Sequence, residues 1–164
     1  WGLSKFLNTS ENNHLPRPVT IQNGYNLINR TFDIANSEIC IRENCGLLAH
    51  SPLAGGILSG KYLNGKNPSN SRYYSRPKSL SIHNTSRGEI AIKKYQKISK
   101  KYGISMCNLA YSFVLSRPYV TSCILGASSL AQIKQNLKSL SFKLSKQILQ
   151  DIEKVHISDP NPAI

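Results

Sequence analysis

Long hydrophobic runs and the pattern of a secretory signal peptide are both absent from this 164-residue sequence. A membrane-spanning helix needs roughly 20 consecutive apolar residues, and no stretch of the chain approaches that length. We therefore expect a soluble protein. Hydrophobic residues still make up 40% of the chain, which is enough for one domain with a buried core. The sequence begins at Trp1 rather than at Met, which favours a fragment or a processed chain.

Cysteines and histidines lack the spacings of a disulfide framework or a metal site. The four cysteines form no CxxC pair, and three of them lie inside apolar patterns, where a free thiol behaves as a small hydrophobic side chain. We interpret them as reduced, which favours the cytoplasm or another reducing compartment. The four histidines are scattered along the chain, so we expect no metal site.

Acidic residues are scarce: there are 8 Asp and Glu against 21 Lys and Arg, which gives a formal net charge of +13. Such an excess accompanies binding to nucleic acid, to an anionic surface or to an anionic cofactor. The basic residues are spread along the chain, with one concentration between Arg72 and Lys101. No RNP, KH or zinc-finger motif is present, so the charge alone does not identify a nucleic-acid-binding protein.

The most informative stretch is 46–62, GLLAHSPLAGGILSGKY. Gly46–Ala49 is typical of a buried strand, which ends in the polar pair His50 and Ser51 and is followed by a glycine-rich loop. A strand with a polar end and a glycine-rich exit is typical of an α/β site, where the backbone comes close to a ligand. An ordinary strand-to-turn junction fits this stretch equally well.

The order of the expected elements predicts a parallel sheet. Apolar, non-alternating strands alternate with segments whose apolar residues recur at helical spacing, a pattern typical of α/β proteins. The expected strands are residues 1–4, 18–23, 46–49 and 119–125, and the expected helices are residues 32–44, 85–102 and 105–117, with two more that begin at 128 or 129 and at 145. Residues 6–17 and 64–84 are expected to be loops, within one domain over 1–158 that a flexible tail follows at 159–164. Because all four strands end in polar residues, we expect the ligand contacts at one edge of the sheet.

Three motifs with family-like spacing resemble the aldo-keto reductases, most of all their Tas-like branch. They are LPRPVTIQN at 15–23, GLLAHSPLAGGILSGKY at 46–62 and ILGASSLAQIKQN at 124–136. The resemblance covers nearly the whole chain and implies the C-terminal half of a (β/α)8 TIM barrel, namely strands five to eight with their helices. Such barrels run to about 250 residues, so the resemblance implies that a front half is missing. It also implies that the barrel helix expected between 6 and 17 has been lost.

The resemblance implies an extended nicotinamide cofactor, NADPH with NADH as the alternative, along the carboxyl edge of the sheet. Ser4 and Gln22 match the positions that hydrogen-bond the nicotinamide carboxamide, a task that suits hydroxyl and amide groups. His50 matches an aromatic position that stacks on the nicotinamide ring. The chain departs from the family at Lys5, where the family usually has Asn.

The other matching positions are those that hold the phosphates and the adenine in the family. Backbone N–H groups and a cation would neutralise the pyrophosphate, and a helix start would favour a second anion. The pyrophosphate loop comprises Ser51, Pro52, Leu53, Gly55, Gly60 and Lys61, the adenosine-phosphate site Gly126, Ala127, Ser128 and Gln132, and the adenine contacts Gln135 and Asn136.

Several of these residues also have plain structural explanations. Gln135 and Asn136 fit a solvated helix face, and Ser128 fits a helix N-cap, which is compatible with phosphate binding. Lys61 fits an ordinary surface lysine, and Gln22 fits a side chain that satisfies a carbonyl at the end of the barrel.

The family's catalytic Asp, Tyr, Lys and His fall on the first four strands, which this chain lacks. The resemblance therefore implies the cofactor-binding half of a reductase for a small carbonyl substrate, with no catalytic residue of its own. Its open barrel edges would be covered by an N-terminal half-barrel or by other protein chains. The alternative is an inactive reductase remnant that serves as a structural or nucleotide-sensing subunit of a larger assembly, for example a ribonucleoprotein.

Overall fold

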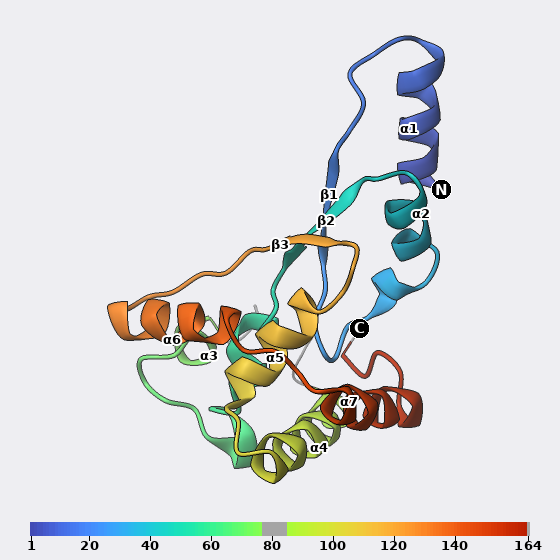
Figure 1. Ribbon diagram of the computed structural model, residues 1–164. Coiled ribbons are helices and arrows are strands. Elements are labelled where there is room, and N and C mark those ends of the chain that lie inside the picture. The colour runs from blue at the N-terminus through green and yellow to red at the C-terminus, as the bar shows by residue number, and fades with distance from the viewer. Residues whose placement is uncertain (77–84, 164) are drawn as a thin grey trace.

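A three-stranded parallel sheet forms the centre of the computed structural model, which describes residues 1–76 and 85–163. Its strands are β1 (Thr20–Gly24), β2 (Gly46–His50) and β3 (Val120–Cys123), in the order β1-β2-β3 (Figure 1). The strands expected at 18–23, 46–49 and 119–125 are thus confirmed. Because all three are parallel, their carboxyl ends meet at one edge of the sheet, with Gly24 opposite His50 in the register.

The N-terminal expectation of a strand at 1–4 and a loop at 6–17 is wrong, because Gly2–Asn12 forms the helix α1. Leu3 and Leu7 lie four residues apart on one face, and Leu7 is only 1% exposed. The helix contacts α2 (Asn36–Arg42), and Arg17 bonds Glu11 and Glu43 at 2.9 and 2.7 Å. The segment before β1 therefore has a helix, contrary to the expectation that one had been lost.

The C-terminal helices begin at capping residues that the sequence had indicated. The helices α4 (Ser86–Lys101), α5 (Met106–Leu115), α6 (Leu130–Leu140) and α7 (Lys146–Ser158) are each preceded by a side chain that accepts a hydrogen bond from the N–H three residues on. These caps are Thr85, Ser105, Ser129 and Ser145.

The connections contain short helical turns that the sequence pattern did not reveal. The 3-10 turns η1 (Thr31–Asp33), η2 (Ala54–Ser59) and η3 (Leu63–Gly65) follow β1 and β2, and α3 (Arg72–Ser75) comes next. The loop expected at 64–84 thus contains part of η3 and all of α3, while its residues 77–84 lie outside the described part of the chain. The helix expected at 32–44 is divided between η1 and α2.

One face of the sheet is buried and the other is open. In β2 the side chains of Leu47 and Ala49 are fully buried, whereas Leu48 and His50 are partly exposed. The buried face belongs to a core shared with α4, α5 and α7 (Figure 1). Gln22, which pairs with Leu48 in the register, is exposed on the open face. A parallel sheet is usually covered on both faces, so this sheet is incomplete by itself.

The C-terminal residues pack against the core, although the sequence suggested a flexible tail at 159–164. Ala163 is 1% exposed, the backbone N–H of Arg30 donates to Asn161 Oδ1 (2.5 Å), and Thr85 Oγ1 donates to the carbonyl of Pro162 (2.9 Å). In residues 1–76 and 85–163 no helix has the length and apolar character to cross a membrane. The architecture is mixed α/β and consistent with part of a (β/α) barrel.

Candidate functional site

Gly24, His50 and Ser51 come together at the carboxyl ends of β1 and β2, and we call these three residues the strand-end cluster. A Cβ added to Gly24 would lie 3.4 Å from His50 Cε1, an ordinary contact distance, so the imidazole packs close to the glycine. His50 Nδ1 lies 3.1 Å from Ser51 Oγ. The backbone is held in place because Tyr25 N–H donates to the His50 carbonyl (3.2 Å). The imidazole is thus held at the strand edge, on the open face.

The loop that leaves β2 has unusual backbone geometry for residues other than glycine. Ser51 and Ala54 adopt φ angles of 56° and 47°, and Gly56 and Gly60 adopt φ angles of 101° and 80°. A non-glycine residue in the left-handed region costs on the order of 1–3 kcal/mol, and such residues cluster at ligand sites. Asn26 Nδ2 donates to the Ser51 carbonyl (3.0 Å), and Ala54 is fully buried, so the surrounding structure holds this conformation.

Lys61 supplies a positive charge to this exit loop. A Cβ on Gly56 would lie 3.2 Å from Lys61 Cε and 3.4 Å from its Nζ, so the lysine crosses directly over the glycine. Its ammonium lies 5.0 Å from the ring centroid of Tyr62. Within the described chain no carboxylate forms an ion pair with Lys61. The charge is therefore available to an anion.

The start of α6 presents a second polar group of predicted residues. The N–H and Oγ of Ser128 both donate to Gln132 Oε1, at 2.9 and 3.2 Å, while Ser129 Oγ accepts from Gln132 N–H at 3.3 Å. Gly126, Ala127 and Ser128 are exposed, and a Cβ on Gly126 would meet nothing within 4 Å. The segment between β3 and α6 runs outward from the sheet (Figure 1). This group is thus exposed at a helix N-terminus, a position that suits an anion if the Gln132 side chain moves off the Ser128 donors.

The structure separates two predicted site residues from the others. Ser4 is not at a strand end but on α1, where it lines a hollow of about 230 Å³ with residues of α2. Asn136 is only 4% exposed, and together with Ser139 it is one of the two buried residues of α6, which packs against α5. Gln135 beside it is exposed. Ser4 was misplaced because the N-terminal segment was interpreted as a strand.

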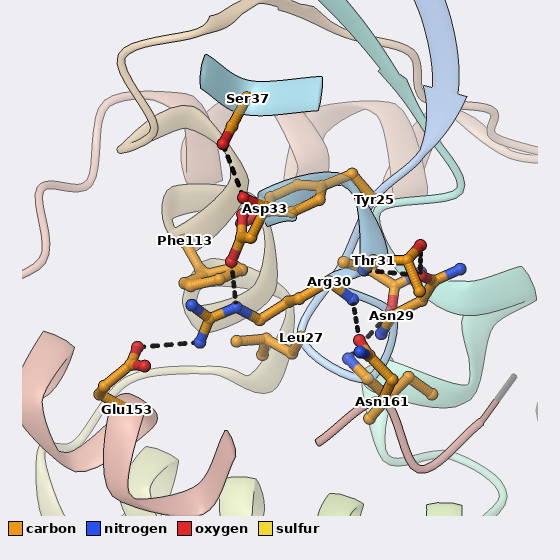
Figure 2. A network of polar contacts seen from close by, with 12 residues as sticks. Tyr25, Leu27, Asn29, Arg30, Thr31, Asp33, Ser37, Phe113, Glu153 and Asn161 are labelled. Carbon is orange, nitrogen blue, oxygen red and sulfur yellow. Dashed lines mark hydrogen bonds and ion pairs between the residues drawn. The ribbon is translucent and has the colours of Figure 1, made fainter. Parts of the chain in front are cut away.

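A network of polar contacts behind the exit of β1 was not predicted (Figure 2). Asp33 accepts hydrogen bonds from Tyr25 Oη (2.8 Å), from Tyr119 Oη and from Arg30 Nε (2.7 Å). Arg30 Nη1 also donates to Glu153 at 2.9 Å. Burial opposes ionisation of Asp33, but the hydrogen bonds from Tyr119, Tyr25 and Arg30 outweigh it and hold its pKa below the ordinary value.

This network fixes the loop that follows β1, because the loop contributes three of its members. Arg30 is 6% exposed, and its guanidinium lies 5.3 Å from the ring centroid of Phe113 on α5. Burial raises the pKa of Tyr25 and of Tyr119, so both hydroxyls stay protonated. Only one signal was visible in the sequence, the YNLINR stretch at 25–30, which directly follows the strand.

The predicted residues at the strand ends, on the loop after β2 and at the start of α6 offer an aromatic ring, an amide and positions that suit anions. The partly exposed His50 ring and the exposed Gln22 amide lie on the open face, near Gly24. The unpaired Lys61 and the open start of α6 suit anions. A nicotinamide dinucleotide has these chemical features.

A family model described as the aldo/keto reductase family matches residues 4–157. The chain is 39% identical over 158 residues to protein tas of Escherichia coli (strain K12), covering 95% of this chain and 45% of that protein. It is 33% identical over 148 residues to the L-glyceraldehyde 3-phosphate reductase of the same strain, covering 84% and 41%. It is 32% identical over 149 residues to a probable voltage-gated potassium channel subunit beta of Oryza sativa subsp. japonica, covering 87% and 45%.

The chain spans less than half the length of these three relatives. The family match nevertheless extends from α1 to α7 and includes every strand of the sheet. This protein chain therefore belongs to the aldo-keto reductase family.

Proposed function

We propose that this chain is the part of an aldo-keto reductase that binds the nicotinamide cofactor, NADPH or NADH, for reduction of a small carbonyl compound. The observation that supports this most directly is the strand-end cluster, where the partly exposed His50 ring packs close to Gly24 and contacts Ser51. Gln22 is exposed on the same open face. A cleft at the carboxyl ends of parallel strands is the usual position for ligands in α/β proteins.

The residues of this chain would bind and orient the cofactor. When bound, the nicotinamide supplies the hydride that reduces a carbonyl carbon. His50 would pack its ring against the nicotinamide, and the Gln22 amide offers both the donor and the acceptor that a carboxamide requires. Lys61 would neutralise the pyrophosphate, and the exposed start of α6 at Ser128 would receive the phosphate at the adenosine end.

A proton donor for the carbonyl oxygen is not assigned to this chain. Reduction of a carbonyl needs a proton as well as a hydride. The two tyrosines nearest the exit of β1, Tyr25 and Tyr119, are both engaged with Asp33 behind the sheet. We assign the proton donor to the part of the family fold that this chain does not span, either in the same polypeptide or in a separate N-terminal half-barrel. Activity would then require both parts.

The proposal is tested by fluorescence titration of the protein with NADPH. Lys61→Glu should weaken binding, because a charge-assisted contact to phosphate contributes about 1.5–3 kcal/mol, or roughly 10- to 150-fold in Kd. Ser128→Glu should weaken binding through repulsion of the phosphate. Lys100→Glu makes the same charge change as Lys61→Glu on an exposed position of α4 and should leave Kd nearly unchanged. Equal affinity in Lys61→Glu and wild type would refute the proposed site.

A second candidate function is that of a structural or nucleotide-sensing subunit in a larger assembly. Two observations favour it: one relative carries the name of a channel subunit, and the net charge of +13 suits an anionic partner such as the RNA of a ribonucleoprotein. Absence of NADPH binding at millimolar concentration, together with normal incorporation of the chain into an assembly, would select the structural role over the reductase.

A further inference from the structure

Asn26, in the loop after β1, joins the two loops that leave β1 and β2. The residue is only 1% exposed. Its Oδ1 accepts hydrogen bonds from the backbone N–H groups of Ile28 and Asn29, both at 3.0 Å, which closes the turn of its own loop. Its Nδ2 donates to the carbonyl of Ser51, in the loop after β2, at 3.0 Å. One buried amide therefore holds both loops.

The backbone that Asn26 holds in the loop after β2 has an unfavourable conformation. Ser51 adopts a φ angle of 56°, in the left-handed region that residues other than glycine rarely adopt. Such a conformation persists only where the surrounding structure imposes it. The N–H of Ala54 also donates to the Ser51 carbonyl, at 2.8 Å, but that bond lies within the same loop. The bond from Asn26 ties the conformation of Ser51 to a different part of the chain.

Ser51 in turn contacts the ring of His50. The distance between Ser51 Oγ and His50 Nδ1 is 3.1 Å, so the hydroxyl faces this nitrogen of the imidazole. Of the other ring atoms, Cε1 and Nε2 lie 3.4 and 3.6 Å from the position of a Cβ on Gly24. The His50 carbonyl accepts from the N–H of Tyr25, the residue before Asn26, at 3.2 Å. Because the Asn26 side chain bonds backbone atoms, it acts on the imidazole through Ser51.

We infer that Asn26 is a positioning residue of the candidate cofactor site, which fixes the His50 imidazole by fixing Ser51. Without the bond from Asn26, Ser51 would relax out of the left-handed region and carry its hydroxyl away from His50 Nδ1. A ring that is oriented before the ligand arrives loses less conformational freedom on binding, which favours affinity. The role deepens the proposed function and rests on it for the identity of the ligand, a nicotinamide dinucleotide.

The test uses two variants that keep the turn but lose the bond to Ser51. Asn26→Asp retains an oxygen for the N–H groups of Ile28 and Asn29, and Asn26→Ser retains a hydroxyl that makes the same kind of turn more weakly without adding a charge. Neither side chain places a donor at the Ser51 carbonyl at neutral pH. The matched control is Asp33→Asn, which removes a different contact of the same loop and leaves Asn26 in place. Circular dichroism checks that all three variants fold.

Two quantities are measured. In the free protein, the nuclear Overhauser effect between His50 Hε1 and the Gly24 Hα protons reports the position of the ring. It should be present in the wild type and in Asp33→Asn and should weaken in both Asn26 variants. In fluorescence titrations, the Kd for NADPH should rise about 3- to 10-fold in both Asn26 variants, as expected for one lost hydrogen bond, and less than about twofold in Asp33→Asn. A residue that supported only the fold would lower the urea midpoint without moving the ring.

Two results would overturn the inference. One is an Overhauser effect or a Kd that both Asn26 variants leave at the wild-type value. The other is an equal loss of the Overhauser effect in Asp33→Asn, because general loosening of the loop would then explain it. Absence of NADPH binding by the wild type would instead refute the proposed function. The Overhauser effect is measured without NADPH, so it still decides whether Asn26 holds the imidazole.

Discussion

Replacement of Asp33 by Asn should destabilise the protein by about 2–3 kcal/mol, because it removes the anion at the centre of the network in Figure 2. Arg30 and Asp33 have side-chain exposures of 7% and 24%, so their 2.7 Å ion pair is mostly shielded from water. A charge-assisted hydrogen bond of this kind contributes about 1.5–3 kcal/mol. The larger penalty of about 3–5 kcal/mol for a fully buried pair does not apply, since Arg30 keeps the half-exposed Glu153.

The assay is urea denaturation of wild type, Asp33→Asn and the control Glu38→Gln. Glu38 forms an ion pair with Arg42 at 2.8 Å, but the two side chains are 65% and 74% exposed. Exposed pairs contribute about 0–1 kcal/mol, so the control should hardly change the midpoint. If Asp33→Asn lowers the free energy of unfolding no more than Glu38→Gln does, burial adds nothing to the Arg30–Asp33 interaction and the expected loss is wrong.

Two further predictions concern the same scaffold. The stability of the wild type should fall between about pH 5 and pH 3, and the stability of Asp33→Asn should fall less. The folded pKa of Asp33 is below its unfolded value, so its contribution to stability is lost as the carboxylate binds a proton. Equal loss of stability with acid in both proteins, measured by urea titrations, would contradict this. Gly46→Ala should destabilise by about 1–3 kcal/mol, because the new Cβ would lie 1.7 Å from Thr121 Oγ1 and 2.9 Å from Thr121 Cβ. Thr121→Gly removes both of these atoms, so Gly46→Ala should lower the free energy of unfolding much less in that background. If the effects of the two substitutions simply add in a double-mutant cycle, the contact is not the cause.

The sequence predicted the elements whose signals are local. The strand at 46–49 is a continuous apolar run with glycine at its start and a proline break after it, and the structure forms β2 there. The helix starts expected at 85, 105 and 145 are confirmed by the caps Thr85, Ser105 and Ser145, because capping depends on the next three residues only. At the start of α6 the cap is Ser129, while Ser128 bonds the Gln132 side chain.

The features that the sequence did not predict depend on distant contacts. The polar stretch after Phe6 has few apolar residues, and it becomes a helix because Leu7 is buried where α1 contacts α2. Arg30 meets Glu153 and Asn161, which lie 123 and 131 residues further along the chain, so no window of sequence could indicate the network of Figure 2. Of the predicted site residues, those at the ends of β1 and β2 were placed by strand prediction, whereas Ser4 failed with the strand that carried it.

Contacts within this chain fix the two loops that follow β1 and β2. The loop after β1 is fixed to α7 and to the C-terminal residues by Arg30, and the loop after β2 is fixed by Asn26 and the buried Ala54. Both loops beside the candidate site are therefore held by contacts within the described chain. Lys61→Glu changes an ammonium that has no ion pair in the described chain, whereas Asp33→Asn changes a contact that fixes the loop after β1. Lys61→Glu should then weaken NADPH binding with little change in the urea midpoint, and Asp33→Asn should lower the midpoint. A large loss of stability in Lys61→Glu would show that this lysine supports the fold rather than a ligand.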